Sequence, residues 1–357
     1  MKSFLNKNVM ISGRIIGPQQ APYIIAEMSA NHNGSIDNAF KIIDAAKAAG
    51  ADAVKVQTYH PDTITINCKN EEFLITNGLW AGQSLYELYE KAHMPWGWHK
   101  PLFEYAKKIG ITIFSSPFDK TAIDLLEDLD CPAYKIASFE IVDHELIKYA
   151  AETGKPLIMS TGMASFEEIS EAVVVAQDAG CNQLVLLHCV SGYPSDPEDY
   201  NLLTIKDLSD KFNLLVGLSD HTISNTTANA AVALGASIIE KHFTLDRNGG
   251  GPDDSFSMEP SDLIDLCSSS KITKLALGAV NYAPLEAEKL SIEHRRSLYF
   301  VKDLSKGQLV DEECVRSIRP GNGLKPKYLH KIIGQRAARD IKFGTPVSFD
   351  DLLSPIG

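Results

Sequence analysis

The stretch Ala48-Ala-Gly50-Ala-Asp-Ala-Val-Lys-Val-Gln57 joins the end of a helical pattern, a glycine and a mainly apolar strand. Glycine ends helices readily because it adopts the left-handed conformation without a Cβ penalty, and an apolar strand suits a parallel sheet covered on both faces. The same order recurs around Gly110, Gly154, Gly180 and Gly235. The repeat predicts a series of β-α-β units.

Three further apolar segments complete this pattern. Residues 23–28, 132–138 and 213–219 raise the number of predicted strands to eight. Eight parallel strands close a TIM (β/α)8 barrel. A doubly wound open sheet is the alternative, but no G-x-G-x-x-G follows the first strand. We therefore expect an α/β chain built on a TIM barrel.

The pattern changes after residue 283. Residues 284–297 are charged and mostly helical in composition, which indicates a linker, and residues 298–357 form short strand-like pieces separated by glycine turns. We expect a barrel domain at 1–283 and a small β-rich domain at 298–357. A domain of roughly 60 residues buries a modest core, so it should dock onto the barrel or onto a second subunit.

Charge and composition exclude several classes of protein. The net charge of −12 argues against binding to nucleic acid or to an anionic membrane, and no apolar run approaches the ~18 residues of a membrane span. Six scattered cysteines without a C-x-x-C pair indicate reduced thiols, and the N-terminus is too polar for a secretory signal, so we expect a cytoplasmic enzyme. Residues 298–357 hold ten Lys and Arg against seven Asp and Glu. This basic tail should face an anion or an acidic partner subunit.

Two histidines mark a candidate metal site. His221 ends Gly217-Leu-Ser-Asp-His221 and His242 ends Ile238-Ile-Glu-Lys-His242, each just after a short apolar run. If the two strands are parallel neighbours, both imidazoles emerge at one edge of the sheet, where neutral imidazole is a common ligand for divalent ions. Either histidine alone would more simply be a hydrogen-bonded residue at a strand end. We predict that the pair shares a divalent metal ion.

Two lysines mark a candidate anion site. Lys55 and Lys135 lie within otherwise apolar strands, where an ammonium group is costly to bury without an anion. A phosphate is the expected partner. Further donors follow the predicted strands at Ser116, Ser138, Ser160 and Ser191. Two alternatives stay open: pairing of the lysines with Glu27 or Glu140, and a Schiff base of the kind that class I aldolases form.

Motifs along nearly the whole chain resemble the sialic acid synthase family. They are Ile25-Ala-Glu-Met-Ser-Ala-Asn-His-Asn-Gly34, Lys55-Val-Gln57, Ser115-Ser-Pro-Phe118, Tyr134-Lys-Ile-Ala-Ser138, Ser160-Thr-Gly162, Leu218-Ser-Asp-His221, Glu240-Lys-His-Phe-Thr-Leu-Asp246, Gly251-Pro-Asp253 and Arg319-Pro-Gly-Asn-Gly323. The C-terminal module resembles the antifreeze-like (SAF) domain. Three segments look most similar to pseudaminic acid synthases: the motif within residues 25–34, residues 79–89 and residues 316–321. The segment His188-Cys-Val-Ser-Gly-Tyr-Pro194 instead resembles the legionaminic and neuraminic branches more.

The resemblance implies a reaction. Phosphoenolpyruvate would condense with a 2-acetamido sugar, either a 2,4-diacetamido-2,4,6-trideoxy hexose or N-acetylmannosamine, to give a nine-carbon 2-keto acid and phosphate. His221 and His242 would hold Mn²⁺ or Mg²⁺ at the aldehyde of the open-chain sugar, and the lysines and serines would hold the phosphate and carboxylate. Glu140 would handle the proton of the water that captures C2, and Glu27 would orient sugar hydroxyls. Further substrate contacts are expected at Gln57, Tyr193, Ser219 and Asp253.

The resemblance also implies a domain-swapped homodimer. The antifreeze-like domain of one subunit would cover the partner's active site, with Arg319 reaching the N-acetyl group of the sugar, and a basic domain on an acidic barrel agrees with this arrangement. The product would serve surface polysaccharide or flagellin glycosylation. Two other functions compete: a Schiff-base aldolase, and an ice-binding or carbohydrate-binding protein. Polar residues at the end of every predicted strand argue against the last.

Overall fold

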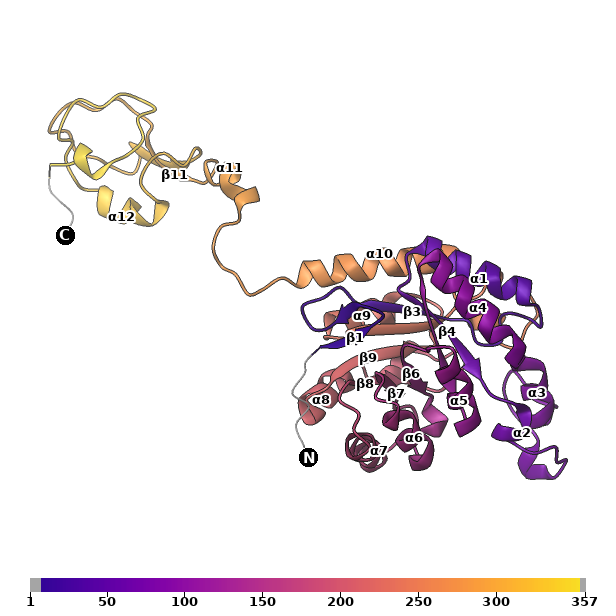
Figure 1. The fold of residues 1–357 in the computed structure, drawn as a ribbon. Coiled ribbons are helices and arrows are strands. Elements are labelled where there is room, and N and C mark those ends of the chain that lie inside the picture. The colour runs from indigo at the N-terminus through magenta and orange to yellow at the C-terminus, as the bar shows by residue number, and fades with distance from the viewer. Residues whose placement is uncertain (1–7, 354–357) are drawn as a thin grey trace. The chain divides into compact units, whose positions relative to one another are not determined.

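The computed structural model describes residues 8–353. Its first unit is built on a closed barrel of parallel strands, hydrogen-bonded in the order β10-β3-β4-β5-β6-β7-β8-β9 (Figure 1). These strands are β3 (Tyr23–Glu27), β4 (Ala53–Thr58), β5 (Thr112–Pro117), β6 (Tyr134–Ile136), β7 (Leu157–Ser160), β8 (Leu184–Cys189), β9 (Leu215–Asp220) and β10 (Ile238–His242). The predicted TIM barrel is therefore confirmed, with one barrel strand from each predicted segment.

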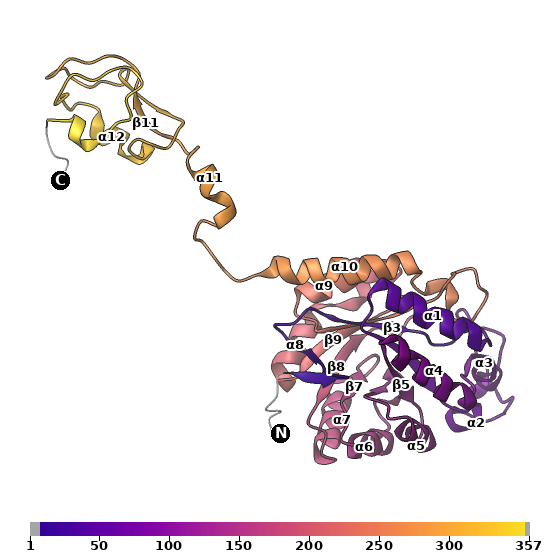
Figure 2. The same ribbon diagram turned by 45° about the horizontal axis from the view of Figure 1, so that its top comes forward.

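Helices surround the barrel, as the two ribbon views show (Figures 1 and 2). They are α1 (Ile36–Ala49), α4 (Trp96–Ile109), α5 (Lys120–Asp128), α6 (His144–Glu152), α7 (Phe166–Asp178), α8 (Leu203–Phe212), α9 (Thr226–Ala233) and α10 (Pro260–Leu277). The five glycines of the sequence repeat all have a positive φ, from 74° at Gly154 to 105° at Gly235. Only glycine adopts this conformation without cost, which explains how each helix gives way to the next strand over a few residues.

A hairpin closes the N-terminal end of the barrel. Strands β1 (Val9–Ile11) and β2 (Arg14–Ile16) pair antiparallel, and the side chains of Val9, Ile11 and Ile16 join the barrel core. The backbone N–H of Met10 donates a 2.8 Å hydrogen bond to Oε1 of Gln183, which lies directly before β8. This end of the barrel is therefore covered, and the carboxyl ends of the strands form the opposite face, where barrel enzymes place their active sites.

An insertion between β4 and α4 carries the short helices α2 (Pro61–Ile64) and α3 (Leu85–Ala92). Part of it forms a small aromatic cluster: the ring of Tyr59 lies edge-on to Tyr89 and to Phe118, with centroids 5.8 and 5.2 Å apart. Another part reaches the loop that follows β10, because Nε1 of Trp80 donates a 3.0 Å hydrogen bond to the carbonyl of Pro252. The insertion therefore contributes to the wall around the strand ends.

The chain divides into two units, Met1–Gly278 and Ala279–Gly357. The second unit contains α11 (Lys289–Ile292), the antiparallel pair β11 (Ser297–Phe300) and β12 (Val315–Ile318), and α12 (Leu329–Ile332). It has its own apolar core, which includes Leu298, Phe300, Val310, Ile332 and Val347. The small β-rich domain expected from the sequence is thus present.

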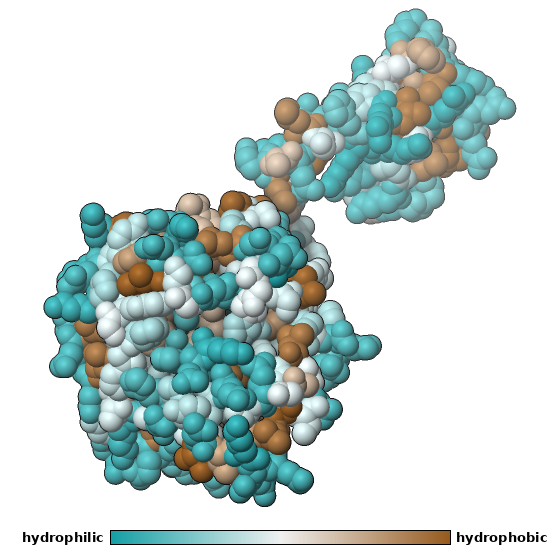
Figure 3. Space-filling model, turned by 90° about the vertical axis from the view of Figure 1, so that its right-hand side faces the viewer, coloured by the Kyte–Doolittle hydropathy of each residue, from teal (hydrophilic) through white to brown (hydrophobic). Residues whose placement is uncertain are grey.

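The surface of the barrel unit that faces the viewer in Figure 3 is mainly hydrophilic, with scattered apolar side chains. Within residues 8–353, no helix is both long enough and apolar enough to cross a membrane. All six cysteines are free thiols, as the sequence predicts.

Candidate active site

The two histidines lie side by side at the carboxyl ends of neighbouring strands. His242 is the last residue of β10, His221 directly follows β9, and their ring centroids are 5.5 Å apart. Ser219 and Glu240 are paired neighbours that point into the barrel, where Glu240 contacts Lys135. His221 and His242 each lie two residues further along and therefore share this inner face. The structure therefore brings the two predicted metal ligands together.

Hydrogen bonding and burial determine which ring nitrogens of the two histidines are free to bind a metal ion. Nδ1 of His221 lies 2.7 Å from the carbonyl of Val190, which can only accept, so Nδ1 carries a proton, and Nε2 holds the lone pair when the ring is neutral. Burial opposes protonation of His221, but a hydrogen bond with Cys189 raises the pKa overall, so a proton and a cation compete for this ring. Burial, together with the positive charges of His221 and Lys55, holds the pKa of His242 well below its usual value. His242 is therefore neutral, as a ligand must be.

These residues fit a divalent cation with mostly open coordination. Nδ1 of His242 is buried and has no hydrogen-bond partner among residues 8–353, and Oδ2 of Asp253 lies 3.8 Å from it. Among residues 8–353, no group of three or more His, Cys, Asp or Glu side chains is placed to hold an ion. Two histidines would therefore be the protein ligands, and water and substrate would fill the remaining positions.

Beside the histidines lies a chain of four alternating buried charges. Nζ of Lys55 is 2.9 Å from Glu27 and 3.6 Å from Glu240, and Nζ of Lys135 is 2.8 Å from the same oxygen of Glu240. Burial opposes ionisation of Glu240, but Lys135 and Lys55 lower its pKa to about 2. Burial raises the pKa of Glu27. The two carboxyl groups are thus unequal: Glu240 stays ionised, and Glu27 takes up a proton more readily.

The pKa values of the two lysines also move apart. Burial opposes the charge on Lys55, yet Glu240 and Glu27 raise its pKa, whereas burial lowers the pKa of Lys135. Both lysines pair with glutamate, one of the two alternatives open from the sequence. The partner of Lys135 is Glu240, however, and not Glu140. Sequence reasoning missed Glu240, although its position two residues before His242 on the same strand placed it on the inner face.

Hydroxyl groups surround this charge chain. Lys55 donates a 3.1 Å hydrogen bond to Ser116, and Ser219 donates a 3.2 Å bond to Glu240. The hydroxyl of Ser160 is buried and has no hydrogen-bond partner in the described part of the chain. Ser138 and Ser191 lie against Gly162, where a Cβ would stand 2.8 Å and 2.4 Å from their Oγ atoms. The structure therefore gathers all four predicted serine donors, with Ser219, around the inner end of the barrel mouth.

Glu140 lies in a short 3-10 helix, Ser138–Glu140, that follows β6. Its Oε2 atom is buried and lacks a hydrogen-bond partner in the structure. Burial raises its pKa to about 7, with Lys135 acting in the opposite direction. A carboxyl group that titrates near neutral pH can both donate and accept a proton.

The outer part of the mouth is polar and aromatic. Nε2 of Gln57 donates to Glu27 at 2.9 Å and to Ser29 at 3.0 Å, and Ser29 donates to Asp253 at 2.6 Å. The ring of Tyr193 lies 4.3 Å from that of His221. These contacts place Gln57, Asp253 and Tyr193 within one continuous wall that also contains Glu27 and the histidines.

Trp80 extends this wall from the insertion. Its ring centroid is 5.9 Å from that of Tyr193, and it borders a cavity of about 660 Å³ shared with Asn33, Lys91 and the segment 249–252. Sequence reasoning identified the aromatic cluster of the insertion but assigned most of it to packing. Arg319, the remaining predicted site residue, is exposed in the second unit just after β12.

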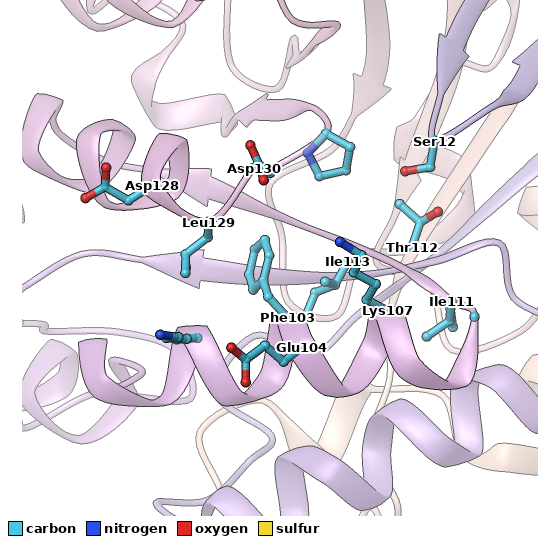
Figure 4. Close-up of a pocket in the computed structure, with 13 residues that line it drawn as sticks. Ser12, Phe103, Glu104, Lys107, Ile111, Thr112, Ile113, Asp128, Leu129 and Asp130 are labelled. Atoms are coloured by element: carbon cyan, nitrogen blue, oxygen red, sulfur yellow. The ribbon is translucent and has the colours of Figure 1, made fainter.

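A second cavity of about 600 Å³ lies away from these residues (Figure 4). Ser12 of the hairpin turn, Ile111 and Thr112 at the start of β5, and Asp130 before β6 line it. This cavity therefore belongs to the N-terminal end of the barrel, where polar residues serve stability more often than chemistry. None of the predicted site residues lines it.

Fold and site together define a TIM-barrel enzyme with a buried lysine pair and an imidazole pair at the carboxyl ends of its strands. The NeuB family model matches residues 42–282, and the SAF domain model matches residues 295–353. The chain belongs to the NeuB family, that is, to the sialic acid synthases.

Individual relatives agree with this assignment. The chain is 44% identical to a pseudaminic acid synthase of Helicobacter pylori, over 93% of this chain and 98% of that one. It is 35% identical to an N,N'-diacetyllegionaminic acid synthase of Legionella pneumophila, over 94% and 96% of the two chains. A crystal structure of an N-acetylneuraminic acid synthetase from Leptospira borgpetersenii, in complex with citrate, superposes with a TM-score of 0.72 at 33% identity, covering 80% of this chain and 95% of that one.

Proposed function

We propose that this chain condenses phosphoenolpyruvate with a 2-acetamido hexose, as a pseudaminic acid synthase, to give a nine-carbon 2-keto sugar acid and phosphate. The observation that carries the proposal is the placement of Lys55 and Lys135 beside His221 and His242 in one buried barrel mouth. An anion site next to a cation site suits a triply charged phosphoenolpyruvate and an aldehyde. The 44% identity to pseudaminic acid synthases supports the 2,4-diacetamido-2,4,6-trideoxy hexose as acceptor.

The anion would displace protein carboxylate from the lysines. In the structure, Glu240 bridges Lys55 and Lys135, so a phosphate or carboxylate of phosphoenolpyruvate would find two ammonium groups already positioned. Charge-assisted hydrogen bonds to such an anion are roughly twice as strong as neutral ones. The donors proposed to complete this site are Ser116, Ser138, Ser160, Ser191 and Ser219.

His221 and His242 would hold Mn²⁺ or Mg²⁺. When bound, the ion supplies Lewis-acid polarisation of the sugar aldehyde. Glu140, with a pKa of about 7, would take the proton of the water that captures C2. Glu27, Gln57, Tyr193 and Asp253 would orient the hydroxyl and acetamido groups of the sugar.

A domain-swapped homodimer belongs to the same proposal. The second unit folds around its own core and is basic, with ten Lys and Arg against seven Asp and Glu in residues 298–357. Arg319 is exposed and available to reach a partner's barrel. Location in the cytoplasm is supported by the six free cysteines.

The test is phosphate release from phosphoenolpyruvate against a panel of acceptors: the 2,4-diacetamido-2,4,6-trideoxy hexoses of the pseudaminic and legionaminic series, and N-acetylmannosamine. Mass spectrometry identifies the product. We expect the highest kcat/KM with the pseudaminic precursor and complete loss of activity with a chelator. Preference for another sugar would reassign the chain to the legionaminic or neuraminic branch. Borohydride trapping of substrate on Lys55 or Lys135, with chelator-resistant activity, would instead establish a Schiff-base aldolase.

A further inference from the structure

A buried ion pair lies directly beside the histidine pair, on the outer side of the same two strands. Asp220 and Lys241 are paired neighbours across β9 and β10, and each immediately precedes one of the histidines. Because successive residues of a strand point to opposite faces, the ion pair faces the helices while the histidines face the barrel interior. Nζ of Lys241 lies 2.7 Å from Oδ2 of Asp220, and the two side chains are 2% and 0% exposed.

The ammonium group of Lys241 binds the chain on both sides of His221. Besides Asp220, it donates to the carbonyl of Thr222 at 2.6 Å and to the carbonyl of Ser224 at 3.1 Å. Oδ1 of Asp220 accepts a 2.9 Å hydrogen bond from the backbone N–H of Thr222. The turn that carries His221 is therefore closed by Asp220 before the histidine and by two carbonyl groups after it.

These contacts couple the two histidines through the backbone. Lys241 is covalently joined to His242, and its ammonium group holds the residues on either side of His221. A shift of one strand end relative to the other would stretch the bonds from Lys241 to Asp220, Thr222 and Ser224. The atoms that Lys241 contacts do not belong to the anion site, since Lys55 and Lys135 bond to Glu27, Glu240 and Ser116.

We propose that Lys241 and Asp220 are positioning residues that fix the separation of His221 and His242 so that both imidazoles can bind one divalent cation. The inference rests on the proposed function for the presence of the cation. Stability alone does not explain a buried ion pair at this position, because well-packed neutral residues can replace such a pair without loss of stability. If the pair were merely structural, removing it would destabilise the whole barrel. If it positions the histidines, removing it should weaken cation binding selectively.

The experiment measures Mn²⁺ binding by the full-length, metal-free protein with electron paramagnetic resonance. The variant is Asp220→Asn/Lys241→Met, which removes both charges, leaves no unpaired buried ion and keeps an acceptor for the N–H of Thr222. Phosphoenolpyruvate binding and Tm are measured on the same samples. Arg14→Met is the matched control, because Arg14 forms an ion pair with Asp52 at the opposite end of the barrel. Lys241→Met alone is a second variant, to be compared with the double variant where it folds.

We expect the double variant to weaken Mn²⁺ binding by about 10- to 100-fold, the usual effect of losing an outer contact that orients metal ligands. Phosphoenolpyruvate binding should stay within about twofold of wild type, and the control variant should bind Mn²⁺ as wild type does. Unchanged Mn²⁺ affinity in the double variant, or equal weakening of both ligands together with a lower Tm, would overturn the proposal. Absence of Mn²⁺ binding by the wild-type protein would also overturn it. Selective loss of Mn²⁺ binding, in a protein that releases no phosphate with any sugar, would support the positioning role and reject the proposed reaction.

Discussion

Gly162 shows how a single missing side chain can shape the proposed anion site. A Cβ at this position would lie 2.4 Å from Oγ of Ser191 and 2.8 Å from Oγ of Ser138, closer than such contacts occur. Its φ is not positive, so the requirement for glycine comes from space and not from the backbone conformation. Gly162 therefore leaves room for two serines from different segments, one after β6 and one after β8, to approach one another.

We predict that Gly162→Ala weakens phosphoenolpyruvate binding while the barrel stays folded. Displacing one or both serines would remove a hydrogen bond to a charged group, which contributes about 1.5–3 kcal/mol, or roughly a tenfold to hundredfold loss in kcat/KM. Steady-state kinetics and circular dichroism check this. Gly97→Ala is the control, because a Cβ there would meet nothing within 4 Å in residues 8–353 apart from its own helix. A Gly162→Ala enzyme with normal kinetics would remove Ser138 and Ser191 from the site.

Glu140 should give the enzyme its pH dependence. Its pKa is raised to about 7, chiefly by burial. As the base that takes a proton from water, it must be ionised, so kcat should rise with pH through about 7 and level off above it. Glu140→Gln should lower kcat by about 10²- to 10⁴-fold and abolish this rise of kcat with pH. A fall in rate through the same pH range would show that Glu140 acts as an acid in the slow step.

Glu240 should stabilise the barrel by holding two buried ammonium groups. Glu240→Gln leaves Lys135 without its carboxylate partner, and breaking a buried pair in this way costs about 3–5 kcal/mol. Because the folded-state pKa of about 2 lies below the ordinary value of 4.5, the stabilisation is complete above about pH 4.5 and is lost as the pH falls towards 2. Urea denaturation followed by tryptophan fluorescence measures the free energy of unfolding, since all three tryptophans lie in the barrel unit.

Inorganic phosphate provides a second readout for Glu240→Gln. If the carboxylate occupies the anion site, added phosphate should raise the Tm of the variant more than that of the wild type, because it can replace the missing charge. Glu145→Gln, which alters an exposed ion pair with Lys120, should change stability by less than about 1 kcal/mol. Equal responses to phosphate in both proteins would contradict the assignment of this site.

At the scale of elements, the glycine-rich loop after β10 is fastened to the loop after β3. Oδ2 of Asp254 accepts hydrogen bonds of 2.8 Å from Nδ2 of Asn33 and from the backbone N–H of Gly251, and Oδ1 accepts one from Thr244. Asp254 is 1% exposed. One carboxylate thus joins two loops that border the outer cavity beside Trp80.

We predict that Asp254→Ala raises KM for the sugar more than it lowers kcat. The substitution removes three acceptor contacts, so residues 246–252 should lose order while the inner charge chain keeps its geometry. Faster hydrogen exchange in this segment, together with unchanged phosphoenolpyruvate affinity, would establish the effect. Ser255→Ala, at an exposed position beside the same cavity, is the control. Equal losses in kcat and in sugar affinity would indicate that the loop also serves the chemical step.

At the scale of the whole molecule, the proposed dimer places Arg319 in the partner's active site. Each site would then draw on two chains, and two inactive variants could complement one another. Mixing Glu140→Gln with Arg319→Ala subunits under exchange conditions should restore about a quarter of the wild-type sites, because half of the dimers are mixed and each has one intact site. Neither variant should recover alone. Failure to complement, in dimers shown to exchange subunits, would place Arg319 in its own chain's site or outside the site.

Local sequence determined the architecture of this protein. The repeated helix-glycine-strand pattern acts over a few residues, and each of its five glycines adopts the left-handed backbone that ends a helix. The meeting of the two histidines was predictable for a related reason: parallel strands of a barrel all place their carboxyl ends on one face, where His242 ends β10 and His221 follows β9. Lys55 and Lys135 lie within β4 and β6, and both reach Glu240 inside the same barrel. The motifs that resemble the sialic acid synthases then indicated which reaction to expect, a condensation of phosphoenolpyruvate with an amino sugar.

Tertiary structure alone decided which of these groups are partners. Glu240 bonds to Lys135 across a sequence separation of 105 residues, and Trp80 bonds to Pro252 across 172. Such pairs depend on how the closed barrel staggers its strands and on where an insertion returns to the surface, and neither is encoded by the local pattern. Local sequence selects a backbone conformation, whereas a partner is selected by distance in space. The lysine pair and the histidine pair were therefore predictable as residues, and the carboxylate that joins the lysines was not.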